Sequence, residues 1–289
     1  MMPELIEKIL RNIDEVPSLP ISVSKILEVT KNPNASPNDL NKVISLDPIL
    51  TGKVLKLVNS AYYSISTKVN SIVKAIILLG VNTIRNLALT TAVVPIVGTG
   101  VKKSWLVLNV NGFWKHSIGT GVTAKMIAKH AGIDKKVLEE YFIGGLLHDI
   151  GKVILDHALN EKYSDVIQKS AKENKSLIEL EDELLDINHA KIGKLLAEKW
   201  DLSPELSEVI NFHHNPKECN PDFKHLVYAV AVANIFCQQK KIGSSGNMSD
   251  ISIDEEILSF LKLREEDLNE WEKTISEEIN KASIFMNVQ

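Results

Sequence analysis

The sequence has few cysteines, no long apolar run and no excess of charge of one sign. Its two cysteines, Cys219 and Cys237, cannot form a disulfide framework, which is typical of proteins from reducing compartments. No apolar run approaches the roughly 20 residues that cross a bilayer. Residues 3–10 carry mixed charges on an amphipathic stretch, unlike a signal peptide. We therefore expect a soluble, cytoplasmic protein with no membrane partner.

Basic residues do not predominate, since 33 Lys and Arg stand against 37 Asp and Glu and the formal net charge is -4. A protein whose main role is to bind nucleic acid needs a basic footprint, so no nucleic-acid partner is expected. The length of 289 residues and the hydrophobic fraction of 44% suffice for one large domain or two modest ones, each with a packed core.

Strand signals are scarce, and apolar residues recur at helical spacing through the first hundred residues. Ser36-Pro37 and Asp47-Pro48 each combine a capping side chain with proline at the first helical position, which indicates a helix start. Gly80 is expected to end a helix, and the run from Pro95 to Gly100 to separate two lobes. The predicted helices of this first lobe are 4–13, about 21–30, 37–45, 49–58, 71–80 and one from 82 onward.

The rest of the chain also reads as helical. Residues 242–250 are expected to be a flexible loop, and 254–286 two surface helices that pack on the core. We therefore predict an all-α, two-lobed protein with three segments: an N-terminal helical lobe (1–98), a helical lobe with a histidine cluster (99–241), and a loop with C-terminal helices (242–289). The predicted helices of the second lobe are about 110–131, 137–157, 187–200, 204–214 and 223–240.

The most informative stretch is Ile143-Gly-Gly-Leu-Leu-His148-Asp149-Ile-Gly-Lys152, where a histidine and an aspartate lie inside an apolar run. The run predicts a buried helix, and an unpaired carboxylate there would cost several kcal/mol. Asp149 therefore needs a partner. A metal ion is a suitable one, because neutral imidazole and carboxylate both ligate metals.

Five of the eight histidines fall on or beside the inward stripe of a predicted helix. Small residues beside two of them would leave room for a site between helices. Each alone is explained as a core histidine bonded to a carbonyl, and adjacent histidines also suit a helix C-terminus. Together they would need five separate polar partners, whereas one metal centre satisfies them all. The five are His116, His148, His189, His213 and His214; the remaining three, His130, His157 and His225, are expected at the surface or at caps.

These residues resemble the metal site of the HD phosphohydrolase superfamily, and the first lobe resembles the HDOD domain, the HD-related output domain of bacterial signalling. The resemblance covers about residues 10–240. It is carried by His148-Asp149 in its Leu-Leu-His-Asp-Ile-Gly-Lys setting and by four runs of the first lobe, which also have plain structural interpretations as helix caps. These runs are Pro17-Ser-Leu-Pro20, Asp47-Pro48-Ile-Leu-Thr-Gly-Lys-Val-Leu, Val58-Asn59-Ser60-Ala61 and Ala75-Ile-Ile-Leu-Leu-Gly80.

The resemblance extends to the HD-GYP enzymes, which hydrolyse cyclic di-GMP, and it implies roles for the site residues. Asp149 would bridge two ions, and Lys152 would stand where related enzymes keep a lysine that faces the phosphate. Asn234, on the inward stripe of its helix, stands where the family has a last aspartate and is a poorer ligand. The Gly-Tyr-Pro signature after His214 is missing, so cyclic di-GMP hydrolysis is not expected. The ligands would be His116 and His148 for one ion, and His189, His213 and His214 for the other.

Three functions stay open at this point. The first is a stand-alone HDOD signal-transduction or regulatory module with a metal centre of weak or no catalytic activity. The second is a metal-dependent phosphohydrolase acting on a nucleotide or another phosphoester, and the third an all-helical scaffold with an empty pocket. The cofactor would be one or two divalent or trivalent ions of iron, manganese, zinc or nickel. A signalling protein or a small nucleotide would be the partner, and the sequence does not fix the oligomeric state.

Overall fold

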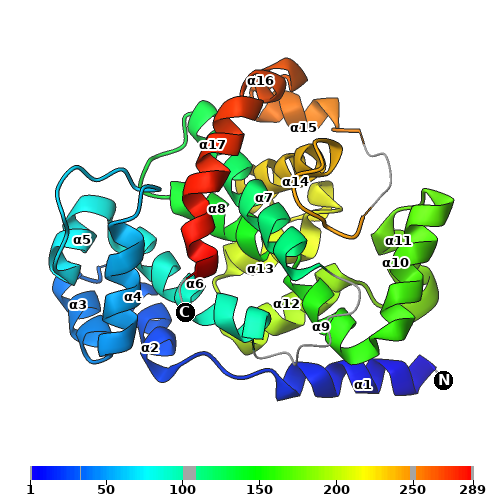
Figure 1. Ribbon diagram of the computed structural model, residues 1–289, viewed down its shortest axis with the longest axis horizontal. Helices are drawn as coiled ribbons and strands as arrows, with labels where there is room; N and C mark the ends of the chain where they lie inside the picture. The colour runs from blue at the N-terminus through cyan, green and yellow to red at the C-terminus, as the bar shows by residue number, and fades with distance from the viewer. Residues whose placement is uncertain (1, 33, 100–108, 248–251, 288–289) are drawn as a thin grey trace.

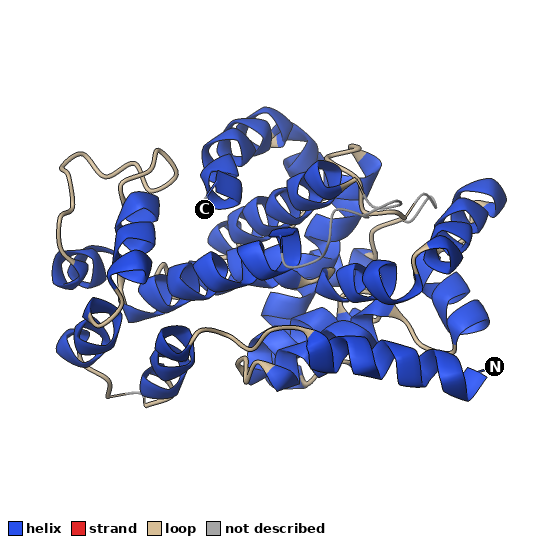
Figure 2. Cartoon of the chain, turned by 60° about the horizontal axis from the view of Figure 1, so that its bottom comes forward, coloured by secondary structure: helices blue, strands red, loops and turns tan. Residues whose placement is uncertain are grey.

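The computed structural model describes residues 2–32, 34–99, 109–247 and 252–287, and within these ranges every regular element is a helix (Figure 1, Figure 2). The predicted all-α fold is confirmed. The helices are α1 (Met2–Glu15), α2 (Ile21–Thr30), α3 (Pro37–Ser45), α4 (Pro48–Val58), α5 (Ile72–Leu79), α6 (Val81–Thr99), α7 (Val110–His130), α8 (Leu138–Leu147), α9 (Ile150–Leu159), α10 (Glu161–Glu173), α11 (Leu177–Leu185), α12 (His189–Lys199), α13 (Pro204–Phe212), α14 (Lys224–Gln239), α15 (Glu255–Phe260), α16 (Glu265–Glu270) and α17 (Glu272–Ala282), with short 3-10 turns η1 (Pro216–Glu218), η2 (Pro221–Phe223) and η3 (Ser283–Asn287).

Helices α2 to α5 gather beside α6 at one end of the molecule (Figure 1). Their starts follow local capping chemistry. The side chains of Ser36 and Asp39 form a reciprocal capping box at α3. Asp47 accepts the backbone N–H of Leu50 at the start of α4 and also the hydroxyl of Ser22, which ties α4 to α2. The helix starts predicted at both Ser-Pro and Asp-Pro pairs are confirmed.

Helix α6 runs through Pro95 to Thr99. The break expected from Pro95 to Gly100 therefore begins inside a helix, and Gly100 lies outside the described residues. The division into segments 1–98, 99–241 and 242–289 stays a proposal. Helix α1, in the first of these segments, packs against α9 and α11 of the second.

Helices α7, α8 and α14 pack together through the middle of the molecule (Figure 1). Glycines let their backbones approach, since a Cβ on Gly145 would lie 2.5 Å from the Cα of Gly121. Gly119 and Gly193 are the small residues beside His116 on α7 and His189 on α12, and they also permit close packing. A Cβ on Gly119 would lie 2.7 Å from the side chain of Ile242, and one on Gly193 would lie 2.6 Å from that of Ile210. The expectation that they leave open room is therefore wrong, because close packing uses the space.

Three expected elements differ from the structure. The helix predicted at 137–157 is two helices, α8 and α9, which meet at His148-Asp149. Helices α10 and α11 were not among the predicted segments. The C-terminal part does pack on the core, with α17 along α7, but it comprises α15, α16, α17 and η3 rather than two helices.

Most of the loop expected at 242–250 packs against the core where it is described, although Ser244 is exposed. We call residues 242–247 the strap. Ser245 and Asn247 are buried, and a Cβ on Gly243 would lie 2.3 Å from the carbonyl oxygen of Gly112 on α7. The flexibility predicted for 242–247 is therefore wrong, and residues 248–250 lie outside the described part of the chain.

Among the described residues no single helix is both long and apolar enough to cross a membrane. Helices α5 and α6 reach that length and composition only as a pair, and they are bent by 119° at their junction.

Candidate metal centre

His148 and Asp149 lie at the junction of α8 and α9, where the backbone of Asp149 (φ -96°, ψ 9°) departs from helical geometry. The first turn of α9 presses on the start of α12, where a Cβ on Gly151 would lie only 1.9 Å from the carbonyl oxygen of His189. Glycine is therefore needed at residue 151. This close approach brings His189 to Asp149, forty residues away in the sequence.

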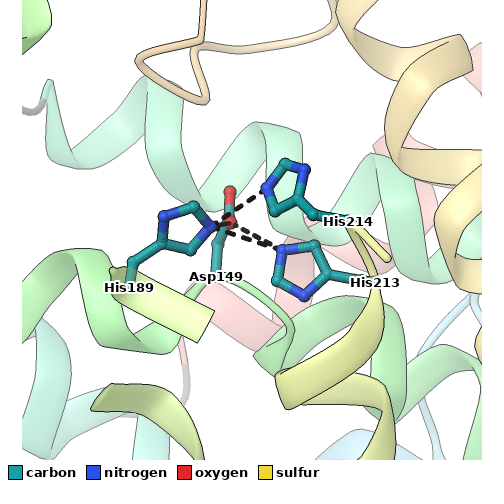
Figure 3. Close-up of side chains that lie close together, drawn as sticks. All are labelled: Asp149, His189, His213 and His214. Atoms are coloured by element: carbon teal, nitrogen blue, oxygen red, sulfur yellow. Dashed lines mark hydrogen bonds and ion pairs between the residues drawn. The ribbon is translucent and has the colours of Figure 1, made fainter. Parts of the chain in front are cut away.

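The imidazoles of His189, His213 and His214 converge on the carboxylate of Asp149 (Figure 3). The Oδ1 atom of Asp149 lies 3.4 Å from the Nε2 of His189 and 3.5 Å from that of His213. The Nε2 of His189 lies 3.4 Å from the Nε2 of His213 and 3.1 Å from that of His214. All except the partly exposed His214 are buried.

Hydrogen bonds at the far side of the rings decide which nitrogen faces the cluster. The Nδ1 of His189 lies 2.5 Å from the carboxylate of Glu181, and the Nδ1 of His213 lies 2.9 Å from the carbonyl oxygen of Ile210. The carbonyl oxygen of Ile210 and the ionised carboxylate of Glu181 each accept a hydrogen from Nδ1, which leaves a lone pair on each Nε2 of the neutral rings. Two lone pairs at 3.4 Å repel one another unless a cation lies between them.

The size of this group fits a metal ion. Four ligands at about 2.1 Å in a tetrahedron are separated by about 3.4 Å from one another. Four of the six separations among the nitrogens and Asp149 Oδ1 are 3.1 to 3.5 Å, close to that spacing, and all four atoms lie within 4.8 Å of one another. Asp149 Oδ1 is buried and has no hydrogen-bond partner among the described residues. The donor set and this orphaned oxygen fit a divalent ion, so the cluster could hold one.

A second group shares Asp149 with the first. Asp149 Oδ2 lies 3.3 Å from the Nε2 of His148 and 3.8 Å from the Nε2 of His116. The Nδ1 of His148 donates to the carbonyl oxygen of Gly145, and its Nε2, which faces Asp149, has no hydrogen-bond partner among the described residues. The ammonium of Lys152 donates to Asp149 Oδ2 at 2.7 Å. This group therefore already contains a cation.

Burial sets the protonation of the cluster. Removal from water lowers the pKa of His189, His213 and His214, and it lowers the pKa of His116 to about 3. Burial alone would raise the pKa of Asp149, but His148 and Lys152 hold it well below its ordinary value. Neutral imidazoles around an ionised carboxylate are the form in which these side chains ligate metals.

Asn234 lies on α14 with its side chain against His116. Its Oδ1 is 3.0 Å from the Nε2 of His116 and accepts the amide of Gln238 at 2.8 Å. The eight residues singled out from the sequence are therefore all brought to one place, although their role as ligands stays a proposal. His130, His157 and His225 are exposed, as expected.

Two residues at the centre, Glu181 and Tyr163, were not identified from the sequence. Glu181 on α11 accepts both the Nδ1–H and the backbone N–H of His189, and it also accepts the hydroxyl of Tyr163 at 2.6 Å. Burial raises the pKa of Glu181 to about 7. Its segment, Leu177-Ile-Glu-Leu-Glu-Asp-Glu-Leu-Leu, reads as a charged surface helix. One sequence feature could have indicated that Glu181 is buried: it lies on the same helical stripe as Leu177 and Leu185, both of which are buried.

A pocket of about 530 Å³ reaches the exposed side of the centre. His213, His214 and Asn234 form its floor, and side chains of α11, α14 and the start of α15 form its walls. Lys152 is not among its lining residues. A small molecule that entered this pocket would meet the histidine group of Figure 3 before any other part of the cluster.

Comparisons with known proteins agree with this architecture. An uncharacterized protein of Treponema pallidum (strain Nichols) is 29% identical over 263 residues, which is 91% of this chain and 49% of that protein, so the chain spans about half the length of this relative. An HDOD domain protein of unknown function from Geobacter sulfurreducens has 24% identity and a TM-score of 0.79 over 98% of both chains. A candidate phosphohydrolase from Shewanella amazonensis SB2B has 26% identity and a TM-score of 0.68, over 95% of this chain and 97% of that one. The HDOD domain model matches residues 16–216, and the chain therefore belongs to the HDOD domain family.

Proposed function

We propose that this protein is a metal-binding HDOD signalling module whose ion lies between His189, His213, His214 and Asp149. The proposal rests on the Nε2 atoms of His189 and His213, whose lone pairs face each other at 3.4 Å. Each lone pair is fixed because the Nδ1 of the same ring donates to an acceptor, Glu181 for His189 and the carbonyl oxygen of Ile210 for His213. A cation at the centre would stabilise such an arrangement. The ion would be iron, manganese, zinc or nickel, all of which accept imidazole and carboxylate ligands.

A regulatory role is favoured over catalysis by the state of the polar groups nearest the ion. Lys152 has no exposed surface, donates to Asp149 and to the carbonyl oxygen of Ser245, and does not line the pocket, so its ammonium is not presented to a bound molecule. Asn234 contributes no charge to the site. In this role the pocket above His214 would bind a small ligand or the side chain of a partner, and the ion would hold the floor of that pocket.

A metal-dependent phosphohydrolase is the second candidate, and the pocket is the observation that favours it. A volume of about 530 Å³ that ends on His213 and His214 admits a phosphoester. When bound, a divalent ion supplies Lewis-acid polarisation of a phosphoryl oxygen. The chain's own contribution would be His214, which is neutral and partly exposed and so could bind or orient the substrate. The structural similarity to the candidate phosphohydrolase from Shewanella amazonensis supports this alternative.

Metal content measured on untagged protein tests the proposal. We expect bound metal in the native protein, its loss in a His148→Ala/Asp149→Ala double variant and in His189→Ala, and its retention in His157→Ala, whose side chain is exposed. Native protein without metal affinity would refute the metal centre. Hydrolysis of bis(p-nitrophenyl) phosphate by the loaded protein, lost in His189→Ala and raised in Asn234→Asp, would favour the phosphohydrolase. Binding of cyclic di-GMP or ppGpp without turnover would favour the sensing module.

A further inference from the structure

The side chain of Lys152 lies in the group formed by His116, His148 and Asp149. It is fully buried, and its ammonium contacts the same oxygen, Asp149 Oδ2, that would serve an ion held by the two histidines. An ion bound to that oxygen at about 2.1 Å could lie no more than about 4.8 Å from the ammonium. The two cations would then share one carboxylate oxygen at close range inside the protein.

The strap holds Lys152 in this position. The carbonyl oxygen of Ser245 accepts the ammonium at 2.9 Å, opposite Asp149. The strap is fixed in turn, because Ser244 donates its backbone N–H to Gly112 on α7, and the side chain of Asn247 accepts the backbone N–H of Leu177 on α11. The ammonium is therefore enclosed by acceptors from two separate parts of the chain.

The strap also acts on His116, through a chain of amides. Asn247 donates to the side-chain oxygen of Gln238, so the amide nitrogen of Gln238 points to Asn234. Asn234 Oδ1 accepts that nitrogen and also faces the Nε2 of His116 at 3.0 Å. An oxygen acceptor at this distance requires a hydrogen on Nε2 of His116, which removes the lone pair that a metal would need.

The charge balance of the buried site also favours one ion over two. Among the described residues, Asp149 and Glu181 are the carboxylates in contact with the clustered histidines. Two divalent ions together with the Lys152 ammonium would leave three uncompensated positive charges in a buried site, whereas one ion leaves a single one. A carboxylate at 234 would reduce that excess, but the chain has asparagine there.

We propose that the centre holds a single ion on the His189, His213 and His214 side, and that the ammonium of Lys152 takes the place of a second ion. This inference rests on the proposed metal centre and specifies its stoichiometry. Lys152 is then a positioning residue that balances Asp149 and orients its free oxygen toward the ion. In this arrangement it cannot also face a phosphate, the role that the family resemblance implies for it.

Titration of the untagged full chain with Mn²⁺, followed by calorimetry and by the Mn²⁺ electron paramagnetic resonance signal, tests the stoichiometry. We expect one equivalent in the native protein. His116→Ala should keep that one equivalent, because His116 does not contact the proposed ion. His189→Ala should weaken binding by at least about 100-fold. Lys152→Met combined with Asn234→Asp, which supplies the missing carboxylate, should gain a second equivalent, with the exchange-coupled spectrum of neighbouring Mn²⁺ ions, and Lys152→Arg should stay at one.

Two equivalents in the native protein, one of which is lost in His116→Ala, would overturn this inference and leave the metal centre standing. No Mn²⁺ binding by the native protein, checked again with Zn²⁺ and Fe²⁺, would instead overturn the proposed centre itself. If circular dichroism shows that the Lys152→Met/Asn234→Asp variant does not fold, the comparison of native protein with His116→Ala decides alone, because that pair leaves Lys152 and the strap intact.

Discussion

Replacing Glu181 should weaken metal binding, although Glu181 is not a proposed ligand. Its Oε2 accepts both the Nδ1–H and the backbone N–H of His189, at 2.5 and 2.9 Å. These bonds fix the ring so that Nε2 faces Asp149 with its lone pair. Without them the hydrogen can move to Nε2, and the ring can turn away from the cluster.

The size of the effect follows from what each substitution leaves in place. In Glu181→Gln the amide oxygen still accepts from His189, and the amide nitrogen can donate to the hydroxyl of Tyr163, so geometry survives and charge is lost. We expect a loss near the lower end of the 10- to 100-fold range for such partners, about 1.4 kcal/mol. Glu181→Ala leaves Nδ1 and a buried hydroxyl without acceptors. We expect metal affinity to fall by about 100-fold. We also expect the metal-free protein to be destabilised by about 1–3 kcal/mol.

Competition between the protein and a fluorescent chelator for Zn²⁺ at pH 7.5 measures this affinity. Glu183→Gln is the matched control, because Glu183 lies on the same helix but is about half exposed and pairs with Lys175 and Lys169. Its Kd should equal that of the native protein. If Glu181→Ala binds Zn²⁺ as tightly as the control while His189→Ala does not, the ring does not need Glu181 and the reasoning is refuted.

Three further predictions concern stability. Gly151→Ala would place a Cβ 1.9 Å from the carbonyl oxygen of His189; we expect about 3 kcal/mol of destabilisation in urea and loss of metal binding, and a native-like midpoint would contradict this. Burial raises the pKa of Asp156 to about 6, so its protonated form favours folding below pH 4 and that stability is lost as pH rises through 6. Asp156→Asn should therefore be more stable than native by about 1–3 kcal/mol at pH 8 and equal at pH 4 in thermal melts. Asn59→Ala removes side-chain bonds to both backbone groups of Val69 and should cost about 1–3 kcal/mol without changing metal stoichiometry.

The starts of the helices could be predicted because the chemistry that sets them is local. Ser36 meets Asp39 three residues later, and Asp47 caps its own helix. The break between α8 and α9 at His148-Asp149 could not be predicted in this way, since apolar residues at helical spacing continue on both sides of it. It arises where α9 meets α12, and the glycine that permits the contact, Gly151, meets a carbonyl thirty-eight residues further on.

The identities of the clustered side chains could also be predicted, because each histidine lies on or beside the apolar stripe of a helix and the motif resembles that of a known family. The hydrogen-bond partners of these side chains could not be predicted from the sequence. Glu181 lies in an acidic helix whose other carboxylates face solvent, and only the packing of α11 on α10 turns this one inward. The strap contains glycine, serine and asparagine, a composition typical of mobile loops, yet its amides and carbonyls complete hydrogen bonds with groups on four helices, α7, α9, α11 and α14.

A ligand motif therefore specifies which atoms are near a metal, but not how many ions they hold. That number depends on which nitrogen of each ring carries a hydrogen and on which cation already satisfies the carboxylate. For His116 the answer is set by Asn247, more than a hundred residues away, through Gln238 and Asn234. For Asp149 it is set by the carbonyl oxygen of Ser245, which any residue at that position would supply. A chain with the same histidines and aspartate, but with a carboxylate at 234 and a strap that leaves Lys152 free, would have both the charge and the lone pair for a second ion.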